Sequence, residues 1–223
     1  MSVTMPATTK LWMQRRSFIA NVTQIAAIER LCYNTNGRRE ASKDCYACRD
    51  EFVLGEGMFW TTDWERSTQV LESYGFAHLI KKRCFANSQQ VMEEVGLSKG
   101  WSYVEGLACS TFGLPLHHAW LVDEEGLVLD PTWDEGDFYL GVPFQWRMVQ
   151  NLITEENCTM LDRWEGGQHP MLGEPDKRVP RENFLEKRWA PVIAEFQQLS
   201  PIWDGSQQIE RTSQWAQISQ KEK

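Results

Sequence analysis

A cysteine at the start of a helix-like segment has the surroundings that most favour chemistry. Cys84 is preceded by "KKR" and followed by "FANSQQVMEEV". A thiol attacks a carbonyl carbon only as the thiolate, and a helix N-terminus supplies free N–H groups and partial positive charge that stabilise this anion. The placement therefore predicts a nucleophile at Cys84. The alternative is a small buried apolar side chain, which is what most free cysteines are.

A histidine pair and an aspartate follow at the ends of two neighbouring strand candidates. His117 and His118 open the first strand, so their side chains face opposite sides of the sheet. The segment "VDEEGLV" predicts a type I turn followed by a glycine bulge, with residues 124–126 as a three-residue loop. In that register Trp120 opposes Asp130, and His118 is the diagonal neighbour of Asp130 on the same face. A two- or four-residue loop would bring His117 there instead.

The hairpin therefore predicts that His118 is the base and that Asp130 orients it. Asp130 precedes Pro131, which donates no ladder hydrogen bond and is typical of a strand end, so the carboxylate would lie at the rim of the sheet. A satisfied structural histidine and a turn-forming D-P-T segment are the alternatives. His78, before an apolar pair, and His169, in a Gly/Pro loop, are the weaker candidates for the base.

Four short motifs occur in a characteristic order. They are C-x-x-N at 84–87, Y-V-E-G at 103–106, H-A-W at 118–120 and D-P-T at 130–132. Together they resemble the transglutaminase-like branch of the papain-like cysteine enzymes, and also small uncharacterised proteins of phage type. The resemblance covers about residues 84–142. It implies an α+β fold in which a catalytic helix packs on a small antiparallel sheet, with a Cys84–His118–Asp130 triad.

Five further residues are candidates for the oxyanion site or for substrate binding: Asn87, Tyr103, Glu105, Trp120 and Trp133. No clear glutamine precedes Cys84, so the oxyanion donor would be the backbone N–H of Cys84, with Asn87 as a side-chain donor or as a local helix-start hydrogen bond. Glu105 would contact substrate or orient the histidine, or be a salt-bridged or exposed strand residue. The two tryptophans would wall a groove or pack in the core.

The remaining elements frame one domain with its core at about 60–153. Helices are predicted at 10–32, at 63–73, from Cys84 to Gly96, and near 144–153. For the helix at 63–73, Thr62 and Glu65 predict a capping box at its start, and Gly75 predicts its end. Strands are predicted at 101–109, 116–122, 127–131 and 138–142. Residues 33–50 and 154–180 read as loops, and 181–199 as a helical extension interrupted at Pro191. The polar composition of 204–223 is typical of a disordered tail.

Composition excludes several classes of function. The net charge of −8 argues against nucleic-acid binding, and no stretch approaches the roughly 18 apolar residues of a membrane span. Without a recognisable signal peptide, we expect a cytoplasmic protein with reduced thiols. Cys45 and Cys48 form half of a zinc motif, with Cys32 as a third ligand and no obvious fourth, so no metal and no cofactor are expected.

The sequence therefore predicts a cysteine-dependent hydrolase or acyltransferase that acts on an amide, isopeptide or related acyl bond through a thioester. Its substrate would be a protein, a peptide or a small amide, and the oligomeric state stays open. The alternatives are a non-catalytic binding protein on the same scaffold and, less favoured, an interaction module stabilised by zinc at Cys45 and Cys48.

Overall fold

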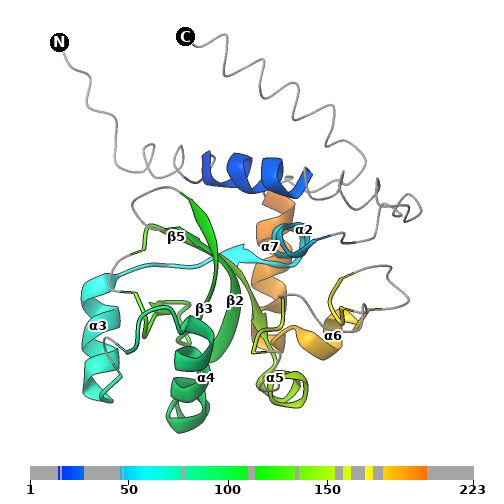
Figure 1. Cartoon of the computed structure of the whole chain (residues 1–223). Coiled ribbons are helices and arrows are strands. Elements are labelled where there is room, and N and C mark those ends of the chain that lie inside the picture. The colour runs from blue at the N-terminus through cyan, green and yellow to red at the C-terminus, as the bar shows by residue number, and fades with distance from the viewer. Residues whose placement is uncertain are drawn as a thin grey trace, which may run out of the picture.

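The computed structural model describes residues 15, 17–27, 46, 48–76, 79–109, 114–133, 136–153, 158–161, 169–172 and 178–199. Helices surround a central sheet, with α3 (Trp64–Ser73) and α7 (Ala190–Leu199) on opposite sides of it in Figure 1. Residues 17–27 are helical, which agrees with the helix predicted at 10–32 over the part that is described. Within the described ranges, no helix is both long and apolar enough to span a bilayer.

A five-stranded antiparallel sheet lies at the centre of the described residues. Its order is β1-β5-β2-β3-β4, with β1 (Met58–Phe59), β2 (Ser102–Cys109), β3 (Pro115–Val122), β4 (Val128–Leu129) and β5 (Phe138–Phe144). All eight residues of β2 are buried, and since successive side chains point to opposite faces, both faces of the sheet are covered there. The predicted α+β class is confirmed.

The strand predictions differ from the structure at β1 and β4, and β5 runs two residues past the predicted end at 142. β1 is not among the predicted strands, because two residues are too few to show an alternating pattern. β4 is shorter than the predicted 127–131, because Asp130 and Pro131 leave the ladder after Leu129.

Helix boundaries needed more corrections. The helices α4 (Cys84–Glu94) and α5 (Trp146–Leu152) correspond to those predicted from Cys84 to Gly96 and near 144–153. The helix α2 (Arg49–Glu56) is not among the predicted helices, and its start overlaps the predicted loop 33–50. The helix α3 is capped by Asp63, whose carboxylate accepts from the Arg66 N–H at 3.1 Å, so the predicted capping box on Thr62 is wrong. Gly75, with φ 78°, follows α3 as predicted. The helix α4 ends at Glu94, two residues before the predicted stop at Gly96, which opens the 3-10 turn η1 (Gly96–Lys99).

The C-terminal extension is broken before Pro191 and not at it. It consists of α6 (Arg181–Phe184), η2 (Lys187–Trp189) and α7, and Pro191 lies in the first turn of α7. Proline fits a first turn because the N–H it lacks has no intrahelical acceptor there. The predicted disordered tail at 204–223 lies outside the described residues.

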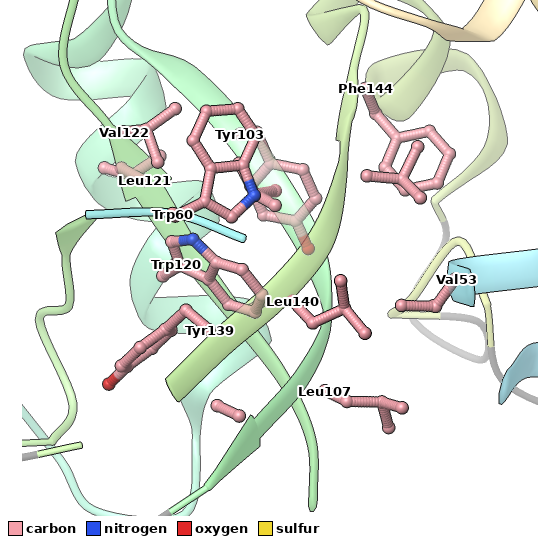
Figure 2. Close-up of a cluster of buried hydrophobic side chains, with 14 of the residues drawn as sticks. Val53, Trp60, Tyr103, Leu107, Trp120, Leu121, Val122, Tyr139, Leu140 and Phe144 are labelled. Carbon is pink, nitrogen blue, oxygen red and sulfur yellow. The ribbon is translucent and has the colours of Figure 1, made fainter. Parts of the chain in front are cut away.

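Aromatic packing connects β3, which carries His118, with β5. The rings of Trp120 in β3 and Tyr139 in β5 lie 4.9 Å apart at an interplanar angle of 78°, and Figure 2 shows them side by side. A Cβ on Gly141 would come within 2.6 Å of the Trp120 ring, so the glycine allows β5 to pass this close. The position of Tyr139 relative to β3 is therefore set by core packing.

Candidate active site

Cys84 is the first residue of α4, as predicted. Arg83 at the N-cap makes no side-chain capping bond, and the Asn87 N–H donates to the Arg83 carbonyl at 2.8 Å. Because the first N–H groups of a helix have no intrahelical acceptor, this turn presents donors beside the thiol. Cys84 is partly exposed.

The hairpin that carries the other two residues has the predicted register. Leu121 pairs with Leu129, and the Asp123 N–H donates to the Leu127 carbonyl at 3.1 Å. Residues 124–126 form the loop, with Gly126 at φ 80° in the left-handed region that this bulge requires. The Asp123 side chain accepts from the Glu125 and Leu127 N–H groups, both at 2.9 Å, which holds the loop closed.

His118, and not His117, faces Asp130. Its Nε2 lies 2.6 Å from Asp130 Oδ2, and both residues are buried. Cys84 also acts on this imidazole, and because Nε2 is taken by Asp130, Nδ1 is the ring nitrogen left for the thiol. Burial alone would lower the pKa of His118, but the Asp130 carboxylate and, less strongly, Cys84 raise it to about 9. The imidazole thus connects thiol and carboxylate.

Asp130 is held by four hydrogen bonds. Its Oδ1 accepts from the N–H groups of Thr132 at 2.9 Å and Trp133 at 3.1 Å. Its Oδ2 accepts from Tyr139 Oη at 2.7 Å in addition to His118. Sequence reasoning missed Tyr139, because its place depends on how β5 pairs with β2 and no local motif signals that pairing. The tight turn at 130–133 thus directs one oxygen to the backbone and the other to the imidazole.

Asn87 connects the start of α4 to the turn that carries Asp130. Its Nδ2 donates to the Ile80 carbonyl at 2.8 Å and to Thr132 Oγ1 at 3.0 Å, and the residue is buried. An amide nitrogen has two hydrogens, so both are committed and the prediction of Asn87 as an oxyanion donor is wrong. A further bond from the Leu79 N–H to the Pro131 carbonyl, 2.9 Å, joins the same two segments. The backbone N–H of Cys84 stays the predicted oxyanion donor.

The two tryptophans have different fates. Trp133 is partly buried and stacks on His118, with ring centroids 4.0 Å apart and planes at 24°. Trp120 is fully buried in the core, so its prediction as a groove wall is wrong. Trp133 therefore covers one face of the imidazole and is, of these two tryptophans, the one that is partly exposed.

Tyr103 and Glu105 are fully buried, so their prediction as substrate contacts is wrong. Glu105 accepts from the Met160 N–H at 2.8 and 2.9 Å and from Tyr103 Oη at 2.8 Å. It also lies 3.6 Å from His117 Nε2, on the face of the sheet opposite to His118. Glu105 therefore does not orient His118 and is not exposed, whereas the alternative of a salt-bridged strand residue agrees with its position beside His117. Its carboxylate anchors residues 158–161 to β2.

The remaining candidates make no second site in the described residues. Cys32, Cys45 and His78 lie outside them, and Cys48 is buried. His169 Nδ1 accepts from the Met171 N–H at 3.1 Å. Within the part of the chain that the structure describes, no group of three or more His, Cys, Asp or Glu side chains is arranged to hold a metal ion.

Comparison of the chain with protein-family models, with curated proteins and with solved structures found no match.

Proposed function

We propose that this protein is a cysteine-dependent hydrolase or acyltransferase of an amide or related acyl bond, with a core of the papain-like, transglutaminase-like type. The observation that carries the proposal is the buried imidazole of His118, whose Nε2 lies 2.6 Å from Asp130 Oδ2 and whose pKa is raised by Asp130 and by the neighbouring Cys84. A nucleophile, a base and a group that orients the base are the parts that acyl transfer through a thioester requires.

The reaction divides into two steps. In the first, the Cys84 thiol proton passes to His118, the sulfur attacks the carbonyl carbon, and the C–N bond breaks as His118 protonates the leaving amine. In the second, water or an acceptor amine attacks the thioester, its proton passes to His118 and returns to the sulfur as the C–S bond breaks. The N–H groups at the start of α4 would stabilise the oxyanion of both tetrahedral intermediates. Asp130 keeps the imidazole in the tautomer that both steps need.

Thiol reactivity at pH 6 tests this proposal without a known substrate. An ordinary thiol is only about 0.3% ionised at that pH, so iodoacetamide should alkylate Cys84 at least about tenfold faster than the exposed Cys158 if the imidazole draws the thiol proton. Peptide mass spectrometry of timed samples reads the two sites in one reaction. His118→Gln should remove the difference, and Asp130→Asn should reduce it.

A reactive Cys84 then justifies a search for substrates among proteins, peptides and small amides, with release of amine or ammonia as the signal and Cys84→Ala as the blank. If Cys84 and Cys158 react at the same rate at pH 6, the enzyme proposal fails, and a non-catalytic binding protein on this scaffold takes its place.

A further inference from the structure

One oxygen of Asp130 is shared between two side-chain donors. His118 Nε2 lies 2.6 Å and Tyr139 Oη 2.7 Å from Oδ2, whereas Oδ1 takes the two backbone N–H groups of the turn. A hydrogen bond to a carboxylate withdraws negative charge from the oxygen that accepts it. The tyrosine thus acts on the same oxygen that attracts the imidazolium.

The hydroxyl of Tyr139 is confined to this position. The side chain is fully buried, with its ring 4.9 Å from that of Trp120 and 5.8 Å from that of Trp64. A Cβ on Gly136 would lie 2.6 Å from Tyr139 Oη, and Trp64 Nε1 donates to the Gly136 carbonyl at 3.1 Å, which fixes that backbone. Burial, and then the Asp130 charge, raise the pKa of Tyr139 well above its usual value, so the hydroxyl keeps its proton and donates.

We propose that Tyr139 is a positioning residue of the acyl-transfer site: its hydroxyl orients Asp130 and limits the pull of that carboxylate on the His118 imidazolium. The inference rests on the proposed function. An imidazole held too firmly in its charged form would take the thiol proton but would release it slowly to the leaving amine. Tyr139 would counter this by taking part of the charge on Oδ2.

The direction of the effect follows from the groups around the imidazole. Asp130, from the turn after β4, and Cys84, from α4, face His118, while Tyr139, from β5, reaches it through Asp130. Removal of the tyrosine hydroxyl leaves more negative charge on Oδ2, which favours the imidazolium. The pKa of His118 should therefore rise in Tyr139→Phe, whereas simple loosening of the site would weaken the His118–Asp130 bond and lower it.

The test is a pH titration of the imidazole signals by NMR in the full chain, with the His118 resonance assigned by its loss in His118→Gln. Tyr139→Phe should raise the pKa of His118 by on the order of one unit. Tyr46→Phe is the matched control, because Tyr46 Oη also donates to a buried carboxylate, Glu56, at 2.8 Å, away from the site. That variant should leave the pKa of His118 unchanged. An unchanged or lowered value in folded Tyr139→Phe would overturn the inference.

Gly136→Ala provides a second variant that keeps the hydroxyl. Its new Cβ would displace Tyr139 Oη from Asp130, so the pKa of His118 should rise as in Tyr139→Phe. A folded Gly136→Ala protein with the original value would count against the inference. The proposed function fails separately, if Cys84 is no more reactive than Cys158, because the imidazole titration does not depend on alkylation.

Discussion

Loss of the His118 proton at alkaline pH should make the folded protein less stable. The pKa of His118 is about 9 in the folded chain, against a reference of 6.5. A group with a raised folded pKa contributes its full stability below the unfolded value and loses it as pH rises through the folded value. At about 1.36 kcal/mol per pKa unit, this rise corresponds to about 3 kcal/mol of unfolding free energy, lost between about pH 6.5 and pH 9. His118 is almost fully buried, so solvent screens little of this energy.

Urea unfolding, followed by tryptophan fluorescence between pH 6 and pH 9.5, measures this loss. The eleven tryptophans provide the signal, and constant denaturant slopes would show that the same surface is exposed at each pH. The unmodified chain should lose about 3 kcal/mol more than His118→Gln over this range. Asp130→Asn should behave like His118→Gln, because it removes the carboxylate that raises the pKa. Curves of the unmodified chain and His118→Gln that run parallel from pH 6 to pH 9.5 would refute the reasoning.

Two further substitutions separate the site from the scaffold around it. Asn87→Ala leaves the Ile80 carbonyl and the Thr132 hydroxyl without their donor, so it should lower the unfolding free energy by roughly 2 kcal/mol, measured by urea unfolding. It should also slow the alkylation of Cys84, measured by mass spectrometry. An unchanged alkylation rate would count against the link between α4 and the Asp130 turn. Glu105→Gln should lower the unfolding free energy by a similar amount, because the amide nitrogen replaces an oxygen that accepts from the Met160 N–H. The folded variant should keep the alkylation rate of Cys84. A large fall in that rate would contradict the structural role of Glu105.

The relation of His118 to Asp130 could be predicted because it depends on local geometry. The loop 124–126 and the alternation of side chains together determine which histidine shares a face with the aspartate, and both are visible within fourteen residues of sequence, 117–130. The start of α4 at Cys84 is equally local, since it depends on a short run of helix-forming residues. These predictions needed no knowledge of how distant segments pack.

The failed predictions depend on tertiary packing. Tyr103 and Glu105 look like strand residues open to a ligand, until residues 158–161 cover them and Met160 binds the carboxylate. The polar, turn-rich segment 33–50 predicts a loop, yet α2 begins within it at Arg49, and Asp50 and Glu51 in its first turn are buried. Polarity predicts exposure only where no partner is available, and Glu105 finds its partner in the distant segment that carries Met160.

Exposure within the candidate site is graded, and this gradient bears on how a substrate would meet it. Cys84 is partly exposed, whereas His118 and Asp130 are 1% and 4% exposed and Trp133 stacks over the imidazole. Solvent therefore reaches Cys84 more readily than the His118 imidazole, and the proton affinity of that imidazole is set mainly by burial, Asp130 and Cys84. An acyl substrate would have to approach from the side of the thiol and bring its leaving nitrogen to Nδ1 of His118, because Nε2 is held by Asp130. An acceptor for the second step would need the same approach, so the surface around Cys84 would select both the acyl donor and the acceptor.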